Sequence, residues 1–422
     1  MSLIYTILLY LITPVVLLRM AWLGIKTPAY LSGWSRRLGL SVPVPGPGPV
    51  IWIHAVSVGE VQAAVPLVER LVRDRPHHTI LISTITPSGA ATVRRHFGDR
   101  VLHSYLPYDF PYAVRRFVDS VRPVLLLVME TEIWPNLFRY CSEQGIRVVL
   151  ANARLSPRSY NGYYRIRCFS RRVIAGISMI GAQSAADRER FIALGASPER
   201  VIMTGNMKFD VAIPGDIFDQ GQILRRQLAA DRLVWIAAST HDGEEQLILA
   251  AHRAVLERYP SCLLILAPRH PERCNMVADL CVRSGFRTLR KSRAREYPAD
   301  TEVVILDTLG ELMIYYAAAD LAFVGGSLLP CGGHNVLEPA TLGIPVVTGK
   351  YVTNFIELNR SLQDNAAALQ VDGVQELVDS VTMLLADPER RRRMGRAGME
   401  IIERNRGSTD RIMQLIADAI PA

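Results

Sequence analysis

Three ionisable residues lie just beyond apolar runs of the sequence: Glu60, Glu130 and Lys208. The apolar runs cover residues 50–53, 124–129 and 201–204. If these runs are parallel strands of one sheet, the three side chains gather at its carboxyl edge, where open α/β sheets bind ligands. A base, a second carboxylate and a cation at one edge predict the transfer of a group onto a hydroxyl.

The surroundings of the carboxylates favour a chemical role over a local structural one. A glutamate in the first turn of a helix ordinarily only complements the helix dipole. However, Glu60 follows Ser57 and Gly59, which predict a tight strand-to-helix turn that lifts a side chain over the sheet edge. Glu130 and Glu132 come directly after six apolar residues, so burial raises their pKa values unless cations pair with them. Capping of the next helix explains one of these carboxylates but hardly both.

The second half of the chain carries three loops that each follow a predicted strand. Residues 325–327 and 332–338 form a Gly-rich approach to a helix, a pattern that brings backbone N–H groups close to an anion. This pattern matches neither the P-loop nor the dinucleotide fingerprint, so a plain turn stays open. Arg269 follows another strand and suits a phosphate or a solvated loop equally. With the loop at 307–312, these features together predict a nucleotide pocket.

Strands and helical patterns alternate along the chain, which predicts right-handed βαβ units and parallel sheets. We expect first-half strands at residues 50–53, 79–83, 124–129, 147–151, 178–182 and 201–204. A break at residues 213–216 is followed by second-half strands at residues 233–238, 262–266, 303–306, 321–324 and 345–347. Two α/β domains facing each other across a cleft are the simplest architecture.

The N-terminus predicts membrane attachment. Residues 1–18 carry no charged side chain, and at about 1.5 Å per helical residue they reach roughly 27 Å, just enough to cross a bilayer. Cations at positions 19, 26, 36 and 37 follow, which places the rest of the chain in the cytoplasm. A helix buried in the protein or lying in the membrane interface stays open. A signal peptide is disfavoured because no basic residue precedes the apolar run.

Composition narrows the class of protein. The chain has 422 residues, of which 49% are hydrophobic and 21% charged, and its net charge of +8 favours phosphorylated or membrane partners. No zinc-finger spacing or RNA-binding signature supports nucleic-acid binding. The six cysteines form no CxxC pair, which indicates reduced thiols without zinc or disulfides. No Asp-x-Asp follows a strand, so a sugar-nucleotide site that depends on a metal finds no support.

Several longer motifs carry a family resemblance. They are Trp52 to Glu60, Glu130 to Asn136, Ala151 to Ser156, Gly205 to Asp210, Ala267 to Pro271 and Gly332 to Asn335. Together they resemble the bacterial 3-deoxy-D-manno-octulosonic acid (Kdo) transferases, and the likeness runs from the N-terminal segment to the last helices. The resemblance implies a GT-B glycosyltransferase, an α/β protein with two Rossmann-like domains facing a central cleft.

The resemblance also sets expected boundaries. We expect a membrane anchor at residues 1–22, an acceptor domain at 23–212 and a nucleotide-sugar domain at 213–405. A C-terminal helix at 406–422 is expected to pack back on the first domain. The expected location is the bacterial inner membrane, with a single-pass anchor and the catalytic domains on the cytoplasmic side.

The implied reaction is an inverting, metal-independent transfer of Kdo from CMP-Kdo to lipid IVA in lipopolysaccharide core synthesis, without a cofactor. Glu60 would be the general base, and Glu130 and Lys208 would stabilise the transition state. The implied substrate-binding residues are Ser57, Gly59, Pro268, Arg269, Gly310, Glu311, Leu312, Asn335, Val336, Leu337 and Glu338.

Two other functions stay open at this point. One is a GT-B transferase that uses a UDP-sugar on another lipid or cell-wall acceptor, and the other is a non-catalytic lipid-binding scaffold. The motifs leave undefined the number of Kdo residues added, the acyl pattern of the acceptor and the oligomeric state.

Overall fold

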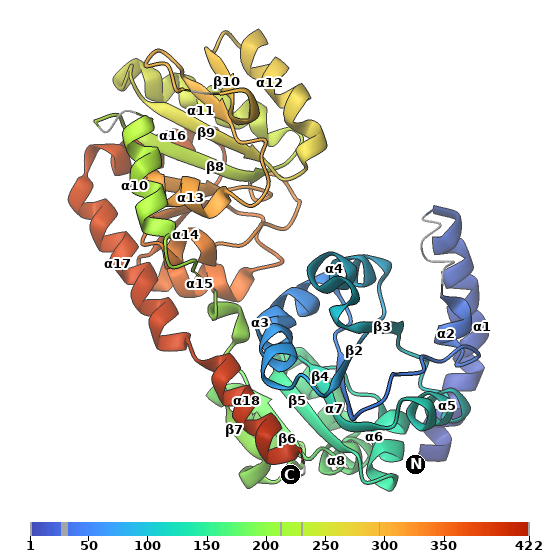
Figure 1. Cartoon of the computed structure of the whole chain (residues 1–422). Helices are drawn as coiled ribbons and strands as arrows, with labels where there is room; N and C mark the ends of the chain where they lie inside the picture. The colour runs from blue at the N-terminus through green and yellow to red at the C-terminus, as the bar shows by residue number, and fades with distance from the viewer. Residues whose placement is uncertain (1, 27–32, 212, 229–230, 295, 421–422) are drawn as a thin grey trace. The chain divides into compact units, whose positions relative to one another are not determined.

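The computed structural model describes residues 2–26, 33–211, 213–228, 231–294 and 296–420. The chain divides into two compact units. The first domain comprises Met1–Asp210 and Asn405–Ala422, and the second comprises Val211–Arg404. Figure 1 follows the chain through both domains, which are described separately below.

The first domain is built on a seven-stranded parallel sheet. Its strands are β1 (Val50–His54), β2 (Thr79–Thr84), β3 (Leu102–Tyr105), β4 (Pro123–Met129), β5 (Arg147–Ala153), β6 (Met179–Ala182) and β7 (Val201–Met203). They lie in the order β3-β2-β1-β4-β5-β6-β7. The order reverses between β1 and β4, and this switch point is where doubly wound sheets bind their ligands. The predicted parallel sheet is therefore confirmed.

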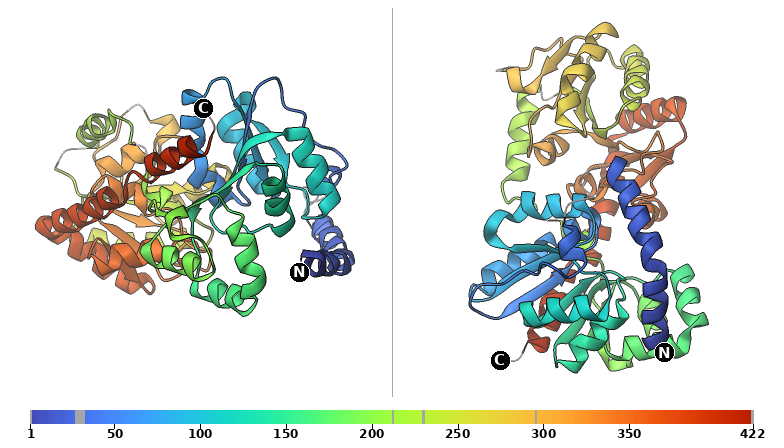
Figure 2. Two further views of the ribbon diagram at one scale, coloured as in Figure 1. Left: turned by 90° about the horizontal axis from the view of Figure 1, so that it is seen from below. Right: turned by 90° about the vertical axis from the view of Figure 1, so that its right-hand side faces the viewer.

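Helices cover both faces of this sheet (Figure 2). Alternate strand residues supply the two cores: Trp52 and Leu126 pack in one, and Ile51 and Leu125 in the other. Burial on both faces explains why the strands read as continuous apolar runs. The helices are α1 (Ser2–Lys26), α2 (Trp34–Arg37), α3 (Val58–Asp74), α4 (Pro87–Phe97), α5 (Pro111–Val121), α6 (Pro135–Glu143), α7 (Pro157–Arg165), α8 (Arg167–Ala175), α9 (Ala185–Ala193) and α18 (Ser408–Ala419).

The last helix belongs to the first domain although it comes from the far end of the chain. Ile412 and Ile416 of α18 are buried in the same core as Ile51 of β1. The carboxylate of Asp210 accepts hydrogen bonds from the backbone N–H groups of Gly407 (2.9 Å) and Thr409 (2.6 Å), so it holds the start of α18. These bonds join the two chain segments that make up the first domain.

The second domain repeats the plan with another seven-stranded parallel sheet. Its strands are β8 (Val234–Thr240), β9 (Leu263–Pro268), β10 (Thr288–Arg290), β11 (Val303–Ile305), β12 (Leu321–Val324), β13 (Val346–Gly349) and β14 (Ala368–Val371). Their order is β10-β11-β9-β8-β12-β13-β14, so the switch point lies between β8 and β12. The helices are α10 (Ile217–Gln227), α11 (Glu244–Arg258), α12 (Cys274–Arg283), α13 (Leu312–Ala318), α14 (Leu337–Thr341), α15 (Ile356–Asp364), α16 (Val374–Ala386) and α17 (Pro388–Asn405).

Three strands were missed by the sequence analysis: β3, β10 and β14. Each of them is an edge strand of its sheet. An edge strand is paired on one side only and is short, so it needs no continuous apolar run. The pattern that identifies central strands is therefore weak at these positions.

The N-terminal segment is helical, as expected, but a membrane crossing is not confirmed. Across the parts of the chain that the structure describes, no helix combines the length and the apolar character that a bilayer crossing requires. The first turns of α1 contact the first domain: the Tyr5 hydroxyl donates to the buried Asp109 carboxylate at 3.0 Å, and the Thr6 hydroxyl lies 3.2 Å from the amide nitrogen of Asn136. Tyr5 also packs on Phe169 of α8, with ring centroids 5.7 Å apart.

Candidate active site

Glu60 lies in the first turn of α3, directly beyond the buried strand β1. Its side chain is only 9% exposed. One carboxylate oxygen accepts a hydrogen bond from the Val56 backbone N–H at 2.8 Å, and the other accepts one from the Ser57 hydroxyl at 3.2 Å. The turn therefore holds the carboxylate in one orientation at the switch point of the first sheet.

Burial raises the pKa of Glu60 from 4.5 to about 7. The Val56 hydrogen bond favours the ionised form and partly opposes this rise, while the nearby charges of Glu130 and Glu132 add to it. A carboxylate with a pKa near neutrality is suited to take a proton and to release it again. Sequence position alone indicated a base here, and the environment now supplies the physical reason.

Glu130 and Lys208 are brought together at the same edge. Glu130 follows β4, and Lys208 lies in a short 3-10 helix (Met207–Phe209) beyond β7. The Lys208 ammonium nitrogen is 3.3 Å from a Glu130 carboxylate oxygen, and both side chains are partly exposed. The Glu130 carboxylate of this pair lies near Glu60, since its charge contributes to the raised pKa of Glu60.

Asn152 connects these two residues to the sheet. It is fully buried at the end of β5, where its backbone has a φ of 55°. Its side-chain oxygen accepts a hydrogen bond from the Met207 N–H at 3.0 Å, one residue before Lys208. Glu130 also has a φ of 55°, and its N–H bonds to the Ala151 carbonyl at 2.9 Å. A left-handed backbone is uncommon for residues other than glycine, although asparagine adopts it more readily, and such conformations cluster at functional sites.

Contrary to the prediction from the sequence, Ser57 and Gly59 do not both lie in the turn between β1 and α3. Ser57 is the residue that precedes α3, and Gly59 already lies inside the helix with no left-handed φ. A Cβ atom added at Gly59 would have the Ser57 hydroxyl oxygen, 4.0 Å away, as its nearest neighbour. The fold itself therefore does not require glycine here, and the open space in front of it lies next to Glu60.

In the second domain, Pro268, Arg269, Gly310 and Leu312 line one small cavity of about 170 Å³. It lies beyond the carboxyl ends of β9 and β11. The Arg269 guanidinium is exposed and, within the described residues, forms no ion pair. A small pocket beside a free guanidinium can take the base and the phosphate of one nucleotide.

Other residues that were predicted to bind the nucleotide form hydrogen bonds or ion pairs within the chain. Glu311 forms an ion pair with Lys291, with 3.6 Å between nitrogen and oxygen, and accepts a hydrogen bond from the Thr308 hydroxyl. The Asn335 amide donates to the Glu338 carboxylate at 3.1 Å. Burial raises the pKa of Glu338, while Asn335 and the charge of Arg269 lower it. Val336 and Leu337 are buried, and the Leu337 N–H donates to the Asn335 side-chain oxygen at 3.1 Å.

Glu244 is the main residue that the sequence analysis missed. It is fully buried, and its carboxylate accepts four backbone hydrogen bonds, from the N–H groups of His241 (3.0 Å), Gly326 (2.7 Å), Ser327 (2.9 Å) and Leu328 (2.9 Å). The Gly-rich loop after β12 therefore already holds an anion from its own chain. The N–H groups of residues 325–327 are all used within the chain, because that of Gly325 donates to the Ala238 carbonyl at 2.8 Å. The full burial of Glu244 at the start of α11 indicates this role, and burial is known only from the folded structure.

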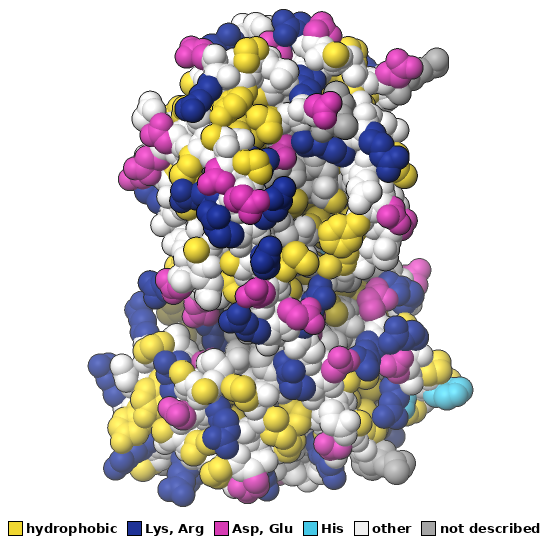
Figure 3. Space-filling model, turned by 90° about the vertical axis from the view of Figure 1, so that its left-hand side faces the viewer, with side chains coloured by type: hydrophobic (Ala, Val, Ile, Leu, Met, Phe, Trp, Pro, Cys, Tyr) yellow, Lys and Arg dark blue, Asp and Glu magenta, His cyan; other side chains and the backbone are white. Residues whose placement is uncertain are grey.

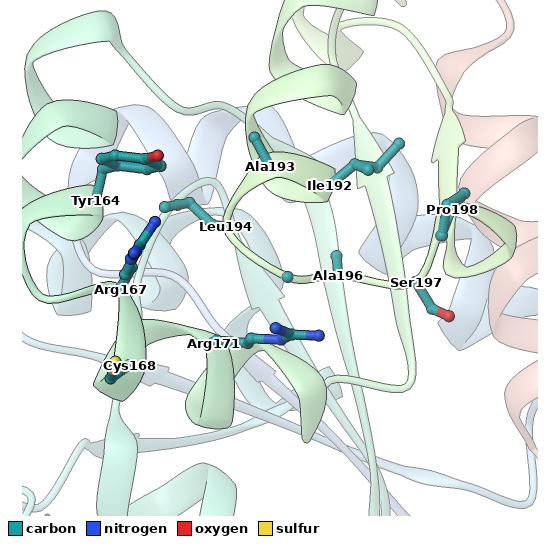
Figure 4. A pocket seen from close by; sticks show the side chains of 11 residues that line it. Tyr164, Arg167, Cys168, Arg171, Ile192, Ala193, Leu194, Ala196, Ser197 and Pro198 are labelled. Atoms are coloured by element: carbon teal, nitrogen blue, oxygen red, sulfur yellow. The ribbon is translucent and has the colours of Figure 1, made fainter.

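A hollow larger than the second-domain cavity of about 170 Å³ lies in the first domain (Figure 4). It has a volume of about 780 Å³ and is lined by α8, the end of α9 and the loop that follows. Arg167 and Arg171 lie on its wall. It contains none of the predicted site residues, so its size does not make it the candidate active site. On the surface shown in Figure 3, basic side chains are interspersed with acidic and apolar ones and do not gather in one patch.

Solved structures also contain two doubly wound domains of this kind. UDP-GlcNAc 2-epimerase from Neisseria meningitidis, bound to UDP-GlcNAc, has a TM-score of 0.57 at 14% identity, covering 88% of this chain and 100% of that one. A glycosyltransferase from Rickettsia africae has a TM-score of 0.55 at 10% identity, covering 89% and 99%. At such low identities these likenesses define the fold alone: two Rossmann-like domains of the GT-B type.

Sequence comparison narrows the class. Residues 32–211 match the family described as 3-Deoxy-D-manno-octulosonic-acid transferase (kdotransferase), and residues 231–400 match glycosyl transferases group 1. The 3-deoxy-D-manno-octulosonic acid transferase of Haemophilus influenzae is 42% identical over 98% of this chain and 97% of its own. That of Bordetella pertussis is 36% identical over 90% of each chain. The C-terminal CMP-Kdo binding domain of WaaA from Acinetobacter baumannii is 35% identical, covering 44% of this chain and 98% of that one, with a TM-score of 0.43.

The chain therefore belongs to the 3-deoxy-D-manno-octulosonic acid transferase family, and it is a glycosyltransferase. This finding confirms the resemblance drawn from the motifs. It also removes the non-catalytic scaffold from consideration.

Proposed function

We propose that this enzyme transfers Kdo from CMP-Kdo to a hydroxyl of lipid IVA, with inversion at the anomeric carbon. The observation that carries the mechanism is the buried Glu60 carboxylate, whose pKa is raised to about 7 at the switch point of the first sheet. Family membership supports Kdo as the sugar transferred. The donor nucleotide, the acceptor and the residue roles are the proposed parts.

In the proposed step, Glu60 takes the proton of the acceptor hydroxyl. The hydroxyl oxygen forms the new bond to the anomeric carbon from one side. The bond from that carbon to the phosphate oxygen breaks on the other side, and its electron pair leaves with CMP. Inversion follows because attack and departure are in line. General-base catalysis of this kind contributes about 10²- to 10⁴-fold to a rate.

Glu130 and Lys208 stabilise the transition state in this proposal. As the bond to phosphate breaks, positive charge develops on the sugar ring, which the Glu130 carboxylate can face. The Lys208 ammonium can hold the carboxylate of Kdo, an acidic sugar, or share the charge of Glu130. The 3.3 Å ion pair keeps both groups in place before the substrate arrives, so little reorganisation is needed during the reaction.

The second domain binds CMP in this proposal. The base enters the 170 Å³ cavity between Pro268 and Gly310, and the phosphate meets the Arg269 guanidinium. Asn335 and Glu338, joined by their 3.1 Å hydrogen bond, can receive the ribose hydroxyls. These residues lie at or beyond the carboxyl ends of strands in the second sheet, where ligands of α/β sheets bind.

We further propose that α1 attaches the enzyme to the cytoplasmic side of the bacterial inner membrane. Its large apolar side chains are widely exposed, among them Leu11 (70%), Val15 (64%) and Leu18 (72%). Its first turns, in contrast, bind the first domain through Tyr5 and Thr6. A helix with one side on a protein and apolar residues outward is suited to lie in a membrane interface. This position would bring a lipid acceptor to the enzyme.

The test of the reaction is incubation with CMP-Kdo and lipid IVA, followed by mass measurement of the lipid product. We expect a mass gain of one or more Kdo residues with the wild-type enzyme, and product formation about 10²- to 10⁴-fold slower with Glu60→Gln. An unchanged lipid in the wild-type reaction would contradict the proposed acceptor or donor. A thermal shift then separates donors: CMP should raise the Tm, whereas UDP should not. Protection by UDP alone would favour a UDP-sugar donor.

A further inference from the structure

Two histidines in the second domain form a hydrogen bond that the predicted site does not use. The Nε2 atoms of His241 and His334 lie 2.7 Å apart, and their rings are nearly parallel, with an interplanar angle of 2°. His241 follows β8, and His334 lies in the Gly-rich loop that follows β12. The bond therefore joins the two sides of the switch point in the second sheet, where a ligand of this fold is expected.

The contact also shapes the Gly-rich loop. A Cβ atom at Gly326 would come within 2.9 Å of His334 Cδ2 and within 3.4 Å of His241 Cδ2. Gly326 has a φ of 68°, and its carbonyl accepts the Gly333 N–H at 2.7 Å. The absence of a side chain at Gly326 thus lets the two rings lie against the loop. The backbone of Arg269 is also tied to β8, because its backbone N–H donates a hydrogen bond to the carbonyl of Thr240 at 3.0 Å, one residue before His241.

A bond between two Nε2 atoms restricts the protons of the pair. One ring must carry a proton on Nε2 and donate it, and the other must offer its Nε2 lone pair. The pair can accept one further proton on the Nδ1 of the donor ring and keep the bond, which then becomes charge-assisted. A second added proton would break the bond. The pair therefore holds either zero or one positive charge.

The charged surroundings keep the free pair neutral. Burial and the charges of Arg269, His241 and His270 lower the pKa of His334 to about 4. Burial also lowers the pKa of His241, opposed by Glu244 and Glu245 and assisted by His270 and Arg273. These carboxylates have other partners: Glu244 accepts the loop N–H groups, and Arg273 pairs with Glu245 at 2.7 Å and with Asp242 at 3.0 Å. Arg269 is thus the charged group with the largest influence on the pKa of His334, and its guanidinium forms no ion pair in the described chain.

We propose that the His241–His334 pair takes up one proton when a nucleotide phosphate binds beside Arg269, and so adds a second positive charge to the phosphate site. The phosphate of free CMP is a dianion near neutral pH, so it offsets the positive charge of Arg269 and favours the protonated pair. The same charge would oppose the negative charge that grows on the phosphate as it leaves the sugar. This inference rests on the proposed nucleotide site, but it makes a separate statement about protons.

The test is the number of protons taken up when CMP binds, measured by calorimetry in buffers of different ionisation enthalpy between pH 6.5 and 8. Glutamine keeps a hydrogen-bonding atom where Nε2 lies but cannot become charged, so the variants are His241→Gln and His334→Gln. We expect the wild-type protein to take up about half a proton or more near pH 6.5 beyond the uptake of either variant. The affinity for CMP should increase by up to about tenfold for each unit by which the pH falls, in the range where one proton is taken up. The variants should lose this dependence.

Control and contrary outcomes are distinct. His96→Gln, at an exposed position of the first domain, should retain the wild-type proton uptake. The ring signals of one histidine should move to imidazolium values in carbon-proton NMR spectra of the unaltered protein when CMP is added. Equal proton uptake in wild type and both variants would overturn the proposal while leaving the CMP site intact. A wild-type protein that does not bind CMP would overturn the proposed donor and this inference together.

Discussion

The Lys208 ammonium and the Glu130 carboxylate form an ion pair of 3.3 Å between loops that follow β7 and β4. These strands are not neighbours, because β5 and β6 lie between them. The pair therefore depends on how the loops fold back over the sheet edge. Asn152, at the end of β5, holds the Lys208 loop through the Met207 N–H.

Removal of this ion pair should affect catalysis far more than stability. We expect Lys208→Met or Glu130→Gln to lower kcat by about 10²- to 10³-fold, as loss of one preorganised charge does. The free energy of unfolding should change by less than about 1 kcal/mol, because both groups are partly exposed. Glu69→Gln removes an exposed ion pair to Arg100 (2.7 Å) and serves as the control. A similar kcat loss in the control would contradict the assignment.

The pH dependence of activity should follow Glu60. Because the base must be ionised and burial raises its pKa to about 7, kcat should rise with pH and level off above about 7. Glu60→Gln should lose about 10²- to 10⁴-fold in kcat and show no such rise. A rate profile with its midpoint near the ordinary value of 4.5 would be inconsistent with a buried base.

Activity should increase with pH, whereas the contribution of Glu60 to the free energy of unfolding should decrease with pH. The folded state binds the Glu60 proton more tightly than the unfolded state, since the pKa rises from 4.5 to about 7 on folding. This contribution is fully present below pH 4.5 and is lost as pH rises through about 7. Glu60→Gln should therefore exceed the wild type in unfolding free energy at pH 8 by roughly 1–3 kcal/mol, and by much less at pH 4. Denaturant unfolding at both pH values, with Glu69→Gln as the reference on the same helix, measures this.

Gly59 offers a test of acceptor access. Its position has room for a methyl group and no left-handed φ, so Gly59→Ala should leave the free energy of unfolding unchanged or raise it slightly. If the acceptor approaches Glu60 through this space, the substitution should raise the KM for the lipid at least about tenfold, while CMP affinity stays unchanged. Normal kinetics with the lipid would show that the space is not used.

Glu244 should be a structural requirement of the Gly-rich loop. Glu244→Ala leaves four buried backbone N–H groups without their acceptor, which should cost on the order of 3 kcal/mol or more of unfolding free energy. Glu257→Ala, at an exposed position of the same helix, should stay within about 0.5 kcal/mol of wild type. CMP affinity should fall only in the Glu244 variant. Chemical unfolding and calorimetry with CMP are the measurements.

The sequence by itself determined the central strands, the parallel sheets and the loops that carry Glu60, Glu130 and Arg269. These features are readable because strands buried on both faces must be apolar along their whole length, and because parallel strands end at one edge. The edge strands β3, β10 and β14 were not predicted, because a strand that is paired on one side only need not be apolar along its whole length.

Only the tertiary structure decided which polar groups meet. The ion pair of Glu130 with Lys208, the three bonds from residues 326–328 to Glu244 and the His241–His334 contact each join loops far apart in the chain. Strand order and the exact path of each loop set such meetings, and no local pattern encodes them. The pKa of Glu60 belongs to the same class, since it arises from how much water the folded neighbours exclude.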